Sequence, residues 1–187
     1  MIPPFDHNNV LPPYVGTTPT SMASQSPYKC EILEFCQHFA TSWDRVKIQK
    51  GFVRFRIQCC KTYVRQGFQW IDGSFMENVE ESQHRSPNDI DVVTFAFGLN
   101  DYIAKSIKNR FPEFLDSTLS KPKYMVDHYL IVADDDPLTI IESVRYWNQL
   151  FGHNRIGVWK GMVEVPLYED DAKDNEALQF LDSINTL

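Results

Sequence analysis

Trp70-Ile71-Asp72-Gly73-Ser74 and Asn88-Asp89-Ile90-Asp91-Val92-Val93 are the two most informative stretches of this sequence. The first ends a run over 68–72 that predicts a strand, which a Gly-Ser turn closes. The second opens a β-branched and aromatic run over 90–97, which predicts another strand. Because side chains alternate along a strand, we expect Asp89 and Asp91 on one face, with their backbones about 7 Å apart.

Two carboxylates on one face of a buried strand repel each other and lose hydration unless they share a cation. A site built from oxygen ligands suits Mg²⁺, which binds carboxylates together with substrate phosphates and water. Upstream, Gly73 allows the backbone to approach a ligand closely. Ser74 can offer its amide and hydroxyl to a phosphate at the start of a short helix. The two stretches together predict a magnesium and phosphate site.

This ordered combination resembles the polymerase β-like nucleotidyltransferase superfamily, in which a strand ending in Gly-Ser precedes a strand with two acids one residue apart. The resemblance implies that Ser74 steadies a nucleoside triphosphate (NTP), ATP among them, while Asp89 and Asp91 bind magnesium. It also implies a third acid, on a neighbouring strand, that helps to bind the metal activating the attacking hydroxyl. One departure is that fourteen residues separate Ser74 from Asp89, slightly more than is usual in the superfamily.

Asp127 is the best match to this third acid, because it lies inside an apolar run over 124–132 that predicts a strand. Asp134, Asp135 and Asp136 are rivals at the end of the same run. Asp136 is better suited to cap the helix that begins at the next residue. We therefore assign the third catalytic and metal-binding role to Asp127.

The N-terminus carries a second resemblance. Met1-Ile2-Pro3-Pro4-Phe5-Asp6 and Leu11-Pro12-Pro13 look like the start of a largely uncharacterised bacterial family of nucleotidyltransferase-like proteins, in which a proline arm precedes two helices and an Ile-Asp-Gly-Ser-Phe segment like that at 71–75. The similarity covers residues 1 to about 97 well and the rest loosely. Members often lie in mobile or defence-associated gene neighbourhoods, which suggests an antiviral defence setting but no substrate.

The fold class that these patterns predict is α+β, with a small mixed sheet of the polymerase β type flanked by helices. Residues 1–26 are expected to form an extended proline-rich arm, and 27–187 a single domain. Ser26-Pro27 predicts the start of the first helix, and Ser42 the cap of a second that runs to about Arg65. The remaining expected helices and strands cover a short helix and loop over 75–88, a helix over 100–111, a helix from 137, a strand over 162–167 and a helix over 172–184.

Composition excludes several classes of protein. The chain has 187 residues, of which 43% are hydrophobic, so it is not disordered, and a net charge of −7 does not favour a protein that coats duplex nucleic acid. Seven basic residues and no acid lie over 45–71, whereas seven acids lie over 164–182. The basic stretch is interpreted as a solvated stripe partly neutralised by the acidic helix, with RNA or an acidic protein as the alternative ligand.

Nothing in the chain predicts a secreted or membrane protein, so we expect a cytoplasmic one. The N-terminus lacks the pattern of a signal peptide, and no apolar run approaches the roughly 20 residues that cross a bilayer. The four cysteines have no zinc-site spacing and are expected to be buried thiols.

Four further residues are secondary candidates. Arg155 and Lys160 could clamp the triphosphate, although cations there could equally stabilise a helix C-terminus. His128 alternates with Asp127 and is expected in the core on the opposite face of the strand. Asp72 could be a fourth acid of the site, but a carboxylate that stabilises the turn is favoured.

Two functions remain open at this point. The first is Mg²⁺-dependent transfer of a nucleoside monophosphate from an NTP to RNA, a protein or a nucleotide, with an acceptor site supplied by a partner chain or a second copy, in a bacterial defence or toxin–antitoxin setting. The alternative is a subunit that keeps the fold without turnover and acts as a binding or neutralising partner in a complex.

Overall fold

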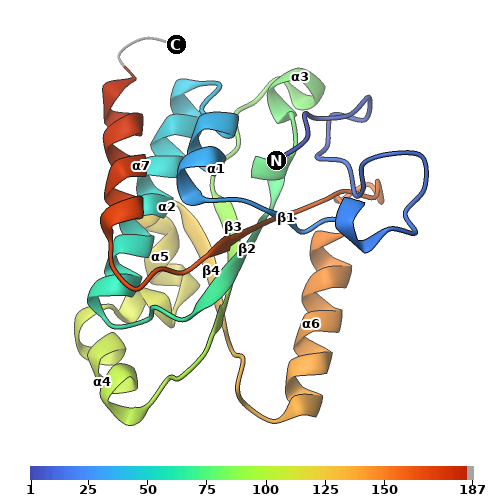
Figure 1. The fold of residues 1–187 in the computed structure, drawn as a ribbon. Coiled ribbons are helices and arrows are strands. Elements are labelled where there is room, and N and C mark those ends of the chain that lie inside the picture. Colours follow the sequence, from blue (N-terminus) through green and yellow to red (C-terminus); the bar gives the residue numbers. More distant parts are fainter. Residues whose placement is uncertain (185–187) are drawn as a thin grey trace.

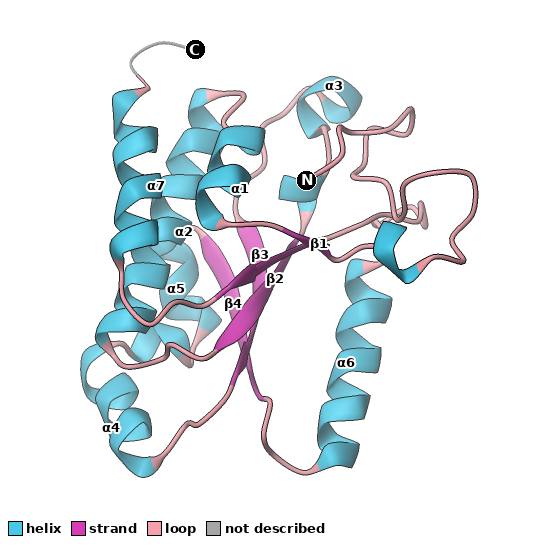
Figure 2. Ribbon diagram, viewed as in Figure 1, coloured by secondary structure: helices cyan, strands magenta, loops and turns pink. Residues whose placement is uncertain are grey.

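The computed structural model describes residues 1–184 and is built around one mixed sheet (Figure 2). The strands follow the order β1-β5-β2-β3-β4. β2 is antiparallel to both of its neighbours, whereas β3 and β4 are parallel, as are β1 and β5. The strands are β1 (Tyr28–Lys29), β2 (Gly67–Asp72), β3 (Ile90–Ala96), β4 (Val126–Val132) and β5 (Val163–Pro166).

The helices cover the two faces of this sheet unequally. In Figure 1, α1, α2, α5 and α7 lie on one side, and α6 lies on the other. The helices are α1 (Ile32–Phe39), α2 (Trp43–Lys61), α3 (Val79–Gln83), α4 (Asp101–Arg110), α5 (Ser117–Tyr124), α6 (Pro137–Phe151) and α7 (Ala172–Ser183), with 3₁₀ turns η1 (Met22–Ser24), η2 (Ser74–Met76) and η3 (Pro112–Phe114). The predicted α+β class, with a mixed sheet flanked by helices, is confirmed.

Two sequence predictions of element boundaries were wrong. Ser26-Pro27 does not start a helix, because residues 28–30 pair with β5, through bonds from the Tyr28 amide to the Met162 carbonyl (2.9 Å) and from the Cys30 amide to the Glu164 carbonyl (3.0 Å). The helix begins only at Ile32.

The other error concerns the start of the strand that carries Asp127. Tyr124 ends α5 instead of opening β4, and Met125 turns the chain in the left-handed conformation (φ 56°) before the strand. By contrast, Ser42 caps α2 as expected, because its side chain accepts a hydrogen bond from the Arg45 amide, and Asp136 caps α6 through the Thr139 amide.

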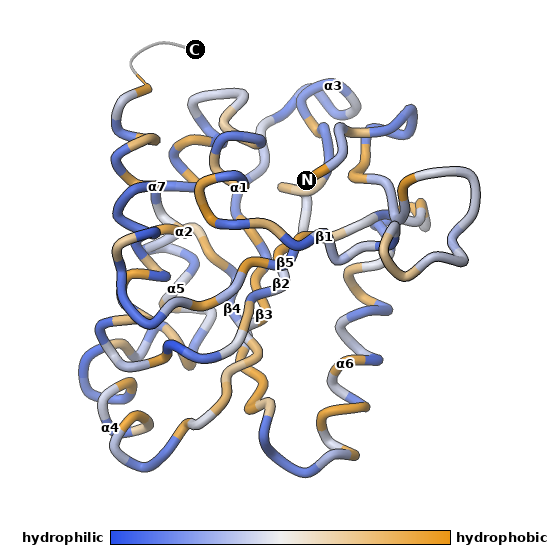
Figure 3. Tube along the Cα trace, in the orientation of Figure 1, coloured by the Kyte–Doolittle hydropathy of each residue, from blue (hydrophilic) through white to orange (hydrophobic). Residues whose placement is uncertain are grey.

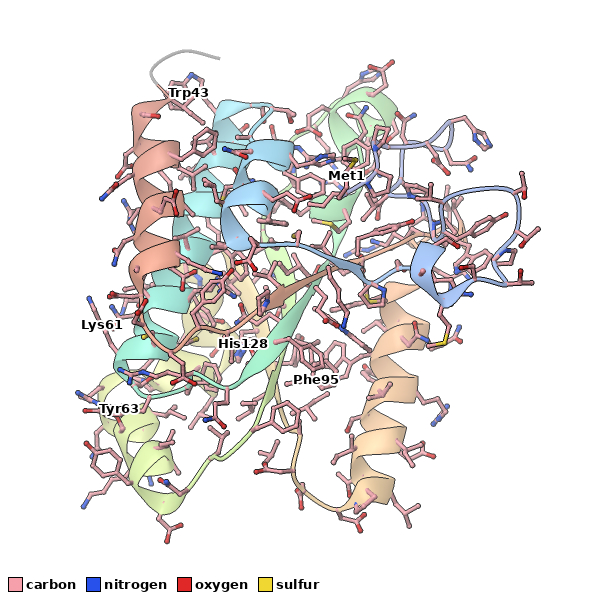
Figure 4. The ribbon with its side chains drawn as sticks, in the orientation of Figure 1. Met1, Trp43, Lys61, Tyr63, Phe95 and His128 are labelled. Carbon is pink, nitrogen blue, oxygen red and sulfur yellow. The ribbon has the colours of Figure 1, made fainter. Side chains whose placement is uncertain are left out.

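The two sheet faces bury separate cores. On the face under α1, α2, α5 and α7, alternate strand residues such as Ile71, Val92 and Val126 join the main core. On the other face, Val93 and Phe95 pack with Trp147 and other residues of the α6 side. Figure 4 shows His128 and Phe95 on opposite sides of the sheet.

A hydrogen-bond chain crosses the main core. Arg56 donates to Asp174 (2.6 Å) and to Gln69 (2.7 Å), and Gln69 in turn donates to the Thr94 hydroxyl (2.9 Å). The Thr94 hydroxyl contacts His128 Nε2 (2.8 Å), and His128 Nδ1 donates to the Phe114 carbonyl (2.9 Å). Because that carbonyl can only accept, Nδ1 of His128 carries a proton. Burial lowers the pKa of His128 to about 3, which keeps the ring neutral at pH 7. His128 is thus a satisfied core residue, as expected.

Two of the seven basic residues over 45–71 are buried, and the others are partly or fully exposed. Arg45 and Arg56 are each 1% exposed, and they pair with Glu80 and Asp174 respectively. Lys50 pairs with Asp182 of α7 (2.9 Å). The expected partial neutralisation by the acidic C-terminal helix is therefore observed for Lys50 and Arg56. The expectation of a solvated stripe was wrong for Arg45 and Arg56, because both side chains are buried.

The proline-rich arm is fastened to the domain by backbone hydrogen bonds. The Leu11 amide donates to the Met76 carbonyl (3.0 Å), and the Gly161 amide donates to the Leu11 carbonyl (2.7 Å). Leu11 is fully buried, and a Cβ at Gly161 would overlap the Pro12 carbonyl. The arm thus lies between the segment after the Gly-Ser turn and the segment before β5.

Three further features of the fold concern the cysteines, the apolar character of the helices and the surface of α6. Cys30, Cys36, Cys59 and Cys60 are all buried free thiols. Within residues 1–184, no helix is long and apolar enough to span a membrane. α6 leaves several apolar side chains exposed, and Figure 3 shows hydrophobic positions along its length.

Candidate active site

Three aspartates form a row across three neighbouring strands. In the sheet register, Asp72 of β2 is paired with Asp91 of β3, and Asp91 is paired with Asp127 of β4. Residues paired in this way project from the same face, about 5 Å from one another. Asp89 immediately precedes β3 and extends the row. We call Asp72, Asp89, Asp91 and Asp127 the acid row; it lies on the sheet face that carries α6.

The acid row lies at one end of the strands, where β2 ends and β3 and β4 begin. β2 runs toward this end and β3 and β4 start from it, so the four carboxylates gather at one edge although they come from distant parts of the chain. The expected placement of Asp127 beside Asp91 is therefore observed. Its catalytic role stays a prediction.

Lys121 of α5 binds two members of the row. Its Nζ lies 2.7 Å from Asp89 Oδ2 and 3.2 Å from Asp127 Oδ2. The lysine side chain is 51% exposed, whereas the two aspartates are 15% and 19% exposed. The hydrogen bond to Asp89, followed by that to Asp127, raises the pKa of the Lys121 ammonium above its usual value.

Asp91 lies between its acidic neighbours without such a partner among the described residues. Burial, followed by the charges of Asp89 and Asp127, raises the pKa of the Asp91 carboxyl to about 6. Asp127 Oδ1 is buried and has no hydrogen-bond partner within residues 1–184. The row therefore holds more negative charge, and more acceptor capacity, than its own contacts satisfy.

The Gly73-Ser74 turn lies against Asp91. Gly73 adopts φ 83°, a conformation that glycine tolerates best, and a Cβ there would overlap Asp91 Oδ2. Ser74 is half-buried at the start of η2, and its hydroxyl makes no hydrogen bond within the described residues. A polar group of Ser74 thus remains available beside the acid row.

The ammonium of Lys160 binds this turn. Its Nζ donates to the Gly73 carbonyl (2.8 Å) and lies 3.2 Å from Glu77 Oε1 and 3.1 Å from Asp72 Oδ1. The Asp72 oxygen is thus within ion-pair distance of the ammonium. Burial nevertheless raises the pKa of the Asp72 carboxyl to about 7, against the lowering effect of Lys160.

The two predicted phosphate clamps lie in different surroundings. Lys160 is 2% exposed and its ammonium is engaged by the turn, so the observed contacts make it a structural support of Gly73. Arg155 is exposed in a small hairpin that the His153–Trp159 bridge closes, and it makes no hydrogen bond or ion pair within residues 1–184. The structure brings Lys160, but not Arg155, into contact with the acid row.

As the side chains lie, the described residues contain no group of three or more His, Cys, Asp or Glu side chains close enough to hold a metal ion. The donor chemistry still fits a hard divalent cation, because the row offers only carboxylate oxygens. Two of these carboxylates already share one cation, the Lys121 ammonium, and the buried Asp127 Oδ1 has no partner among the described residues. Mg²⁺ at this row remains a hypothesis.

A family model matches residues 3–166, which is most of the chain and includes the arm and every member of the acid row. The model is described as a family of unknown function, DUF6932. The chain belongs to this family. No curated protein and no solved structure matches it. The DUF6932 match leaves the activity open, so function has to be inferred from the site itself.

Sequence reasoning missed Lys121 and Glu77. Lys121 lies in α5, a helix that was not predicted, since its residues carry Pro122 and few apolar side chains. Glu77 lies in the stretch expected to hold a short helix and loop, and only its contact with Lys160 distinguishes it from the neighbouring acids. Neither position has a sequence signal of its own.

Proposed function

We propose that this protein is a metal-dependent nucleotidyltransferase that moves a nucleoside monophosphate from an NTP to a hydroxyl acceptor. The observation that carries the proposal is the register that sets Asp91 beside Asp127 and next to the Gly73-Ser74 turn. Acids on adjacent strands beside a free serine hydroxyl suit a metal-bound triphosphate.

Each residue has a role in this proposal. Asp89, Asp91 and Asp127 would hold Mg²⁺, which when bound supplies positive charge to the triphosphate and to the attacking oxygen. The Ser74 hydroxyl would donate to a phosphate oxygen. Asp127 Oδ1, which is buried without a partner among the described residues, is suited to accept the proton of the acceptor hydroxyl.

The transfer balances without a further reactant. The acceptor oxygen forms a bond to the α-phosphorus and loses its proton, while the bond from the α-phosphorus to the bridging oxygen breaks and pyrophosphate leaves. RNA, a protein hydroxyl and a second nucleotide are all acceptors compatible with this chemistry. The small domain leaves the acceptor site to a partner protein or a second copy.

The experiment is a transfer assay with the four NTPs, each labelled at the α-phosphate, in Mg²⁺, with RNA, nucleotides or the protein itself as acceptor. We expect label in one acceptor together with released pyrophosphate. Asp91→Asn should abolish both, whereas Asp101→Asn, an exposed acid at the start of α4, should not.

Two other outcomes separate the alternatives. NTP-dependent thermal stabilisation without transfer, lost in Asp91→Asn, would favour the non-catalytic subunit. Neither transfer nor NTP-dependent stabilisation with Mg²⁺ would rule out the nucleotide site.

A further inference from the structure

Lys121 places its ammonium between two members of the acid row. Its ammonium is bound in common by Asp89 Oδ2 (2.7 Å), just before β3, and by Asp127 Oδ2 (3.2 Å) of β4. A cation held by oxygens of two such carboxylates neutralises charge that would otherwise repel. Lys121 thus supplies a counter-ion to Asp89 and Asp127.

The two lysines of the site differ in their freedom to move. Lys160 is 2% exposed and is held by Asp72, Glu77 and the Gly73 carbonyl. Lys121 is 51% exposed and reaches the row from the surface of α5. A long, flexible side chain of this kind can turn toward solvent without leaving a buried hole. Of these two cations, only Lys121 can leave at low cost.

A divalent ion and an ammonium compete for the same carboxylate oxygens. Both need Asp89 and Asp127, and two cations in contact with the same oxygens repel each other. The doubly charged ion interacts more strongly with the row, and it would also use oxygens that Lys121 leaves unpaired, such as Asp127 Oδ1. Metal entry therefore requires Lys121 to withdraw.

We propose that Lys121 is a displaceable counter-ion, which neutralises the row when it is empty and is expelled when a divalent cation binds. This inference rests on the proposed metal site but does not require transfer activity. It assigns Lys121 a role in setting metal affinity: the lysine lowers the affinity for metal alone and keeps the acids in position until metal arrives.

The test is calorimetric titration of chelator-treated protein with Mn²⁺ alone. Lys121→Met removes the competitor, so its affinity for Mn²⁺ should exceed that of the parent by roughly fivefold to tenfold. Lys121→Arg retains a cation and should stay within about twofold of the parent or bind more weakly. Lys123→Met is the matched control, because Lys123 lies two residues away, is 56% exposed and pairs with Glu113 outside the row.

A second measurement follows unfolding in chelator and in saturating Mn²⁺. Lys121→Met should be less stable than the parent without metal and should gain more from Mn²⁺, because Asp89 and Asp127 are then left without their counter-ion beside Asp91. Lys121→Gln, a neutral replacement that keeps a polar end group, should show the same direction.

The outcomes distinguish this inference from the metal site on which it rests. If Mn²⁺ binds and Asp91→Asn abolishes binding, but Lys121→Met binds no more tightly than the parent, the displacement model is wrong and the metal site stands. If no variant binds Mn²⁺ in a way that depends on Asp91, both are wrong.

Discussion

At the scale of single residues, Asp91 is held in an unfavourable ionised state. Burial and the carboxylates of Asp89 and Asp127 raise its pKa from an ordinary value near 3.8 to about 6. A raised native pKa means that the native state binds more protons than the unfolded state between these two values. The free energy of unfolding therefore falls as pH rises through that window and stays lower at neutral pH.

Replacing the Asp91 carboxylate by a neutral amide should remove this loss in the free energy of unfolding. We expect Asp91→Asn to leave metal-free stability at pH 7 unchanged or raise it by about 1 kcal/mol, and the gain should shrink as pH falls toward 4. Denaturant unfolding in chelator measures it, with Asp101→Asn as control. A loss of several kcal/mol would instead mark Asp91 as the partner of a buried cation.

Gly73 offers a sharper test of the same contact. Gly73→Ala places a methyl group where Asp91 Oδ2 lies, at φ 83°, whereas Gly157→Ala meets open space at φ 82°. A positive φ alone costs an alanine about 1 kcal/mol. Gly73 also has ψ −166°, a backbone region that is nearly exclusive to glycine, so its own penalty is larger. We expect Gly157→Ala to cost about 1 kcal/mol, and Gly73→Ala to cost roughly 2–4 kcal/mol, because the Asp91 carboxylate must also move.

Unfolding of the two glycine variants side by side checks this expectation. Equal losses would show that the turn and Asp91 are not packed together. The combination Gly73→Ala with Asp91→Ala should recover part of the loss, since the overlapping oxygens are then absent.

Some residues of the site could be located from sequence and others could not. Strand periodicity placed Asp89 and Asp91 on one face, and the apolar run around Asp127 predicted a strand there. The grouping of these acids with Ser74, and a third acid on a neighbouring strand, came from the resemblance to the polymerase β-like superfamily. Lys160 was predicted to bind phosphate, but its buried ammonium contacts the Gly73 carbonyl and two acids instead. Such tertiary contacts leave no periodic trace in a sequence.

At the scale of elements, the hydrogen-bond chain from Asp174 to His128 ties α7 and α2 to β2, β3 and β4. Burial lowers the pKa of His128 from its ordinary value near 6.5 to about 3. The contribution of His128 to the free energy of unfolding is therefore fully present above pH 6.5. As the pH falls from 6.5 toward 3, the unfolded state takes up a proton at this histidine and the native state does not, so that contribution is lost progressively.

A substitution at His128 should change how the free energy of unfolding depends on pH. At pH 7, His128→Asn should be destabilising, because the Thr94 hydroxyl loses its acceptor. The difference in unfolding free energy between parent and variant should narrow by about 1 kcal/mol per pH unit between pH 6 and 5, since only the parent has a histidine to protonate. A difference that stays constant over this range would contradict a neutral, buried His128.

Helices and strands were predicted correctly where the periodic pattern of apolar residues extends over enough positions to be recognised. α2, α6 and the longer strands have runs of apolar residues at helical or alternate spacing, and Ser42 and Asp136 mark helix starts. β1 has two residues, too few for any pattern, and exists because β5 offers an edge. α5 was not predicted, and it contains Pro122, a residue that is unfavourable inside a helix.

At the scale of the whole molecule, the arm connects parts of the site that are distant in sequence. Residues 9–12 contact the segment after the Gly-Ser turn and the segment that carries Lys160. Deleting buried apolar atoms from the arm should therefore weaken the whole domain. We expect Leu11→Ala, at a fully buried position, to cost about 2–5 kcal/mol.

Met22→Ala is the control on the same arm, because Met22 is 90% exposed, and it should change stability by less than about 0.5 kcal/mol. Thermal or denaturant unfolding of both variants decides the point. Similar small losses in both would show that the arm is not fastened to the domain in solution.

The central claim is that the acid row binds a metal-bound nucleoside triphosphate. Its most direct test is a crystal structure of the protein with Mn²⁺ and an NTP analogue that cannot be cleaved between the α- and β-phosphates, read from the anomalous signal of manganese. The account predicts manganese in contact with Asp89 and Asp91, a phosphate oxygen at Ser74, and the Lys121 ammonium withdrawn from the row. Manganese and nucleotide bound elsewhere, with Lys121 still between Asp89 and Asp127, would contradict it.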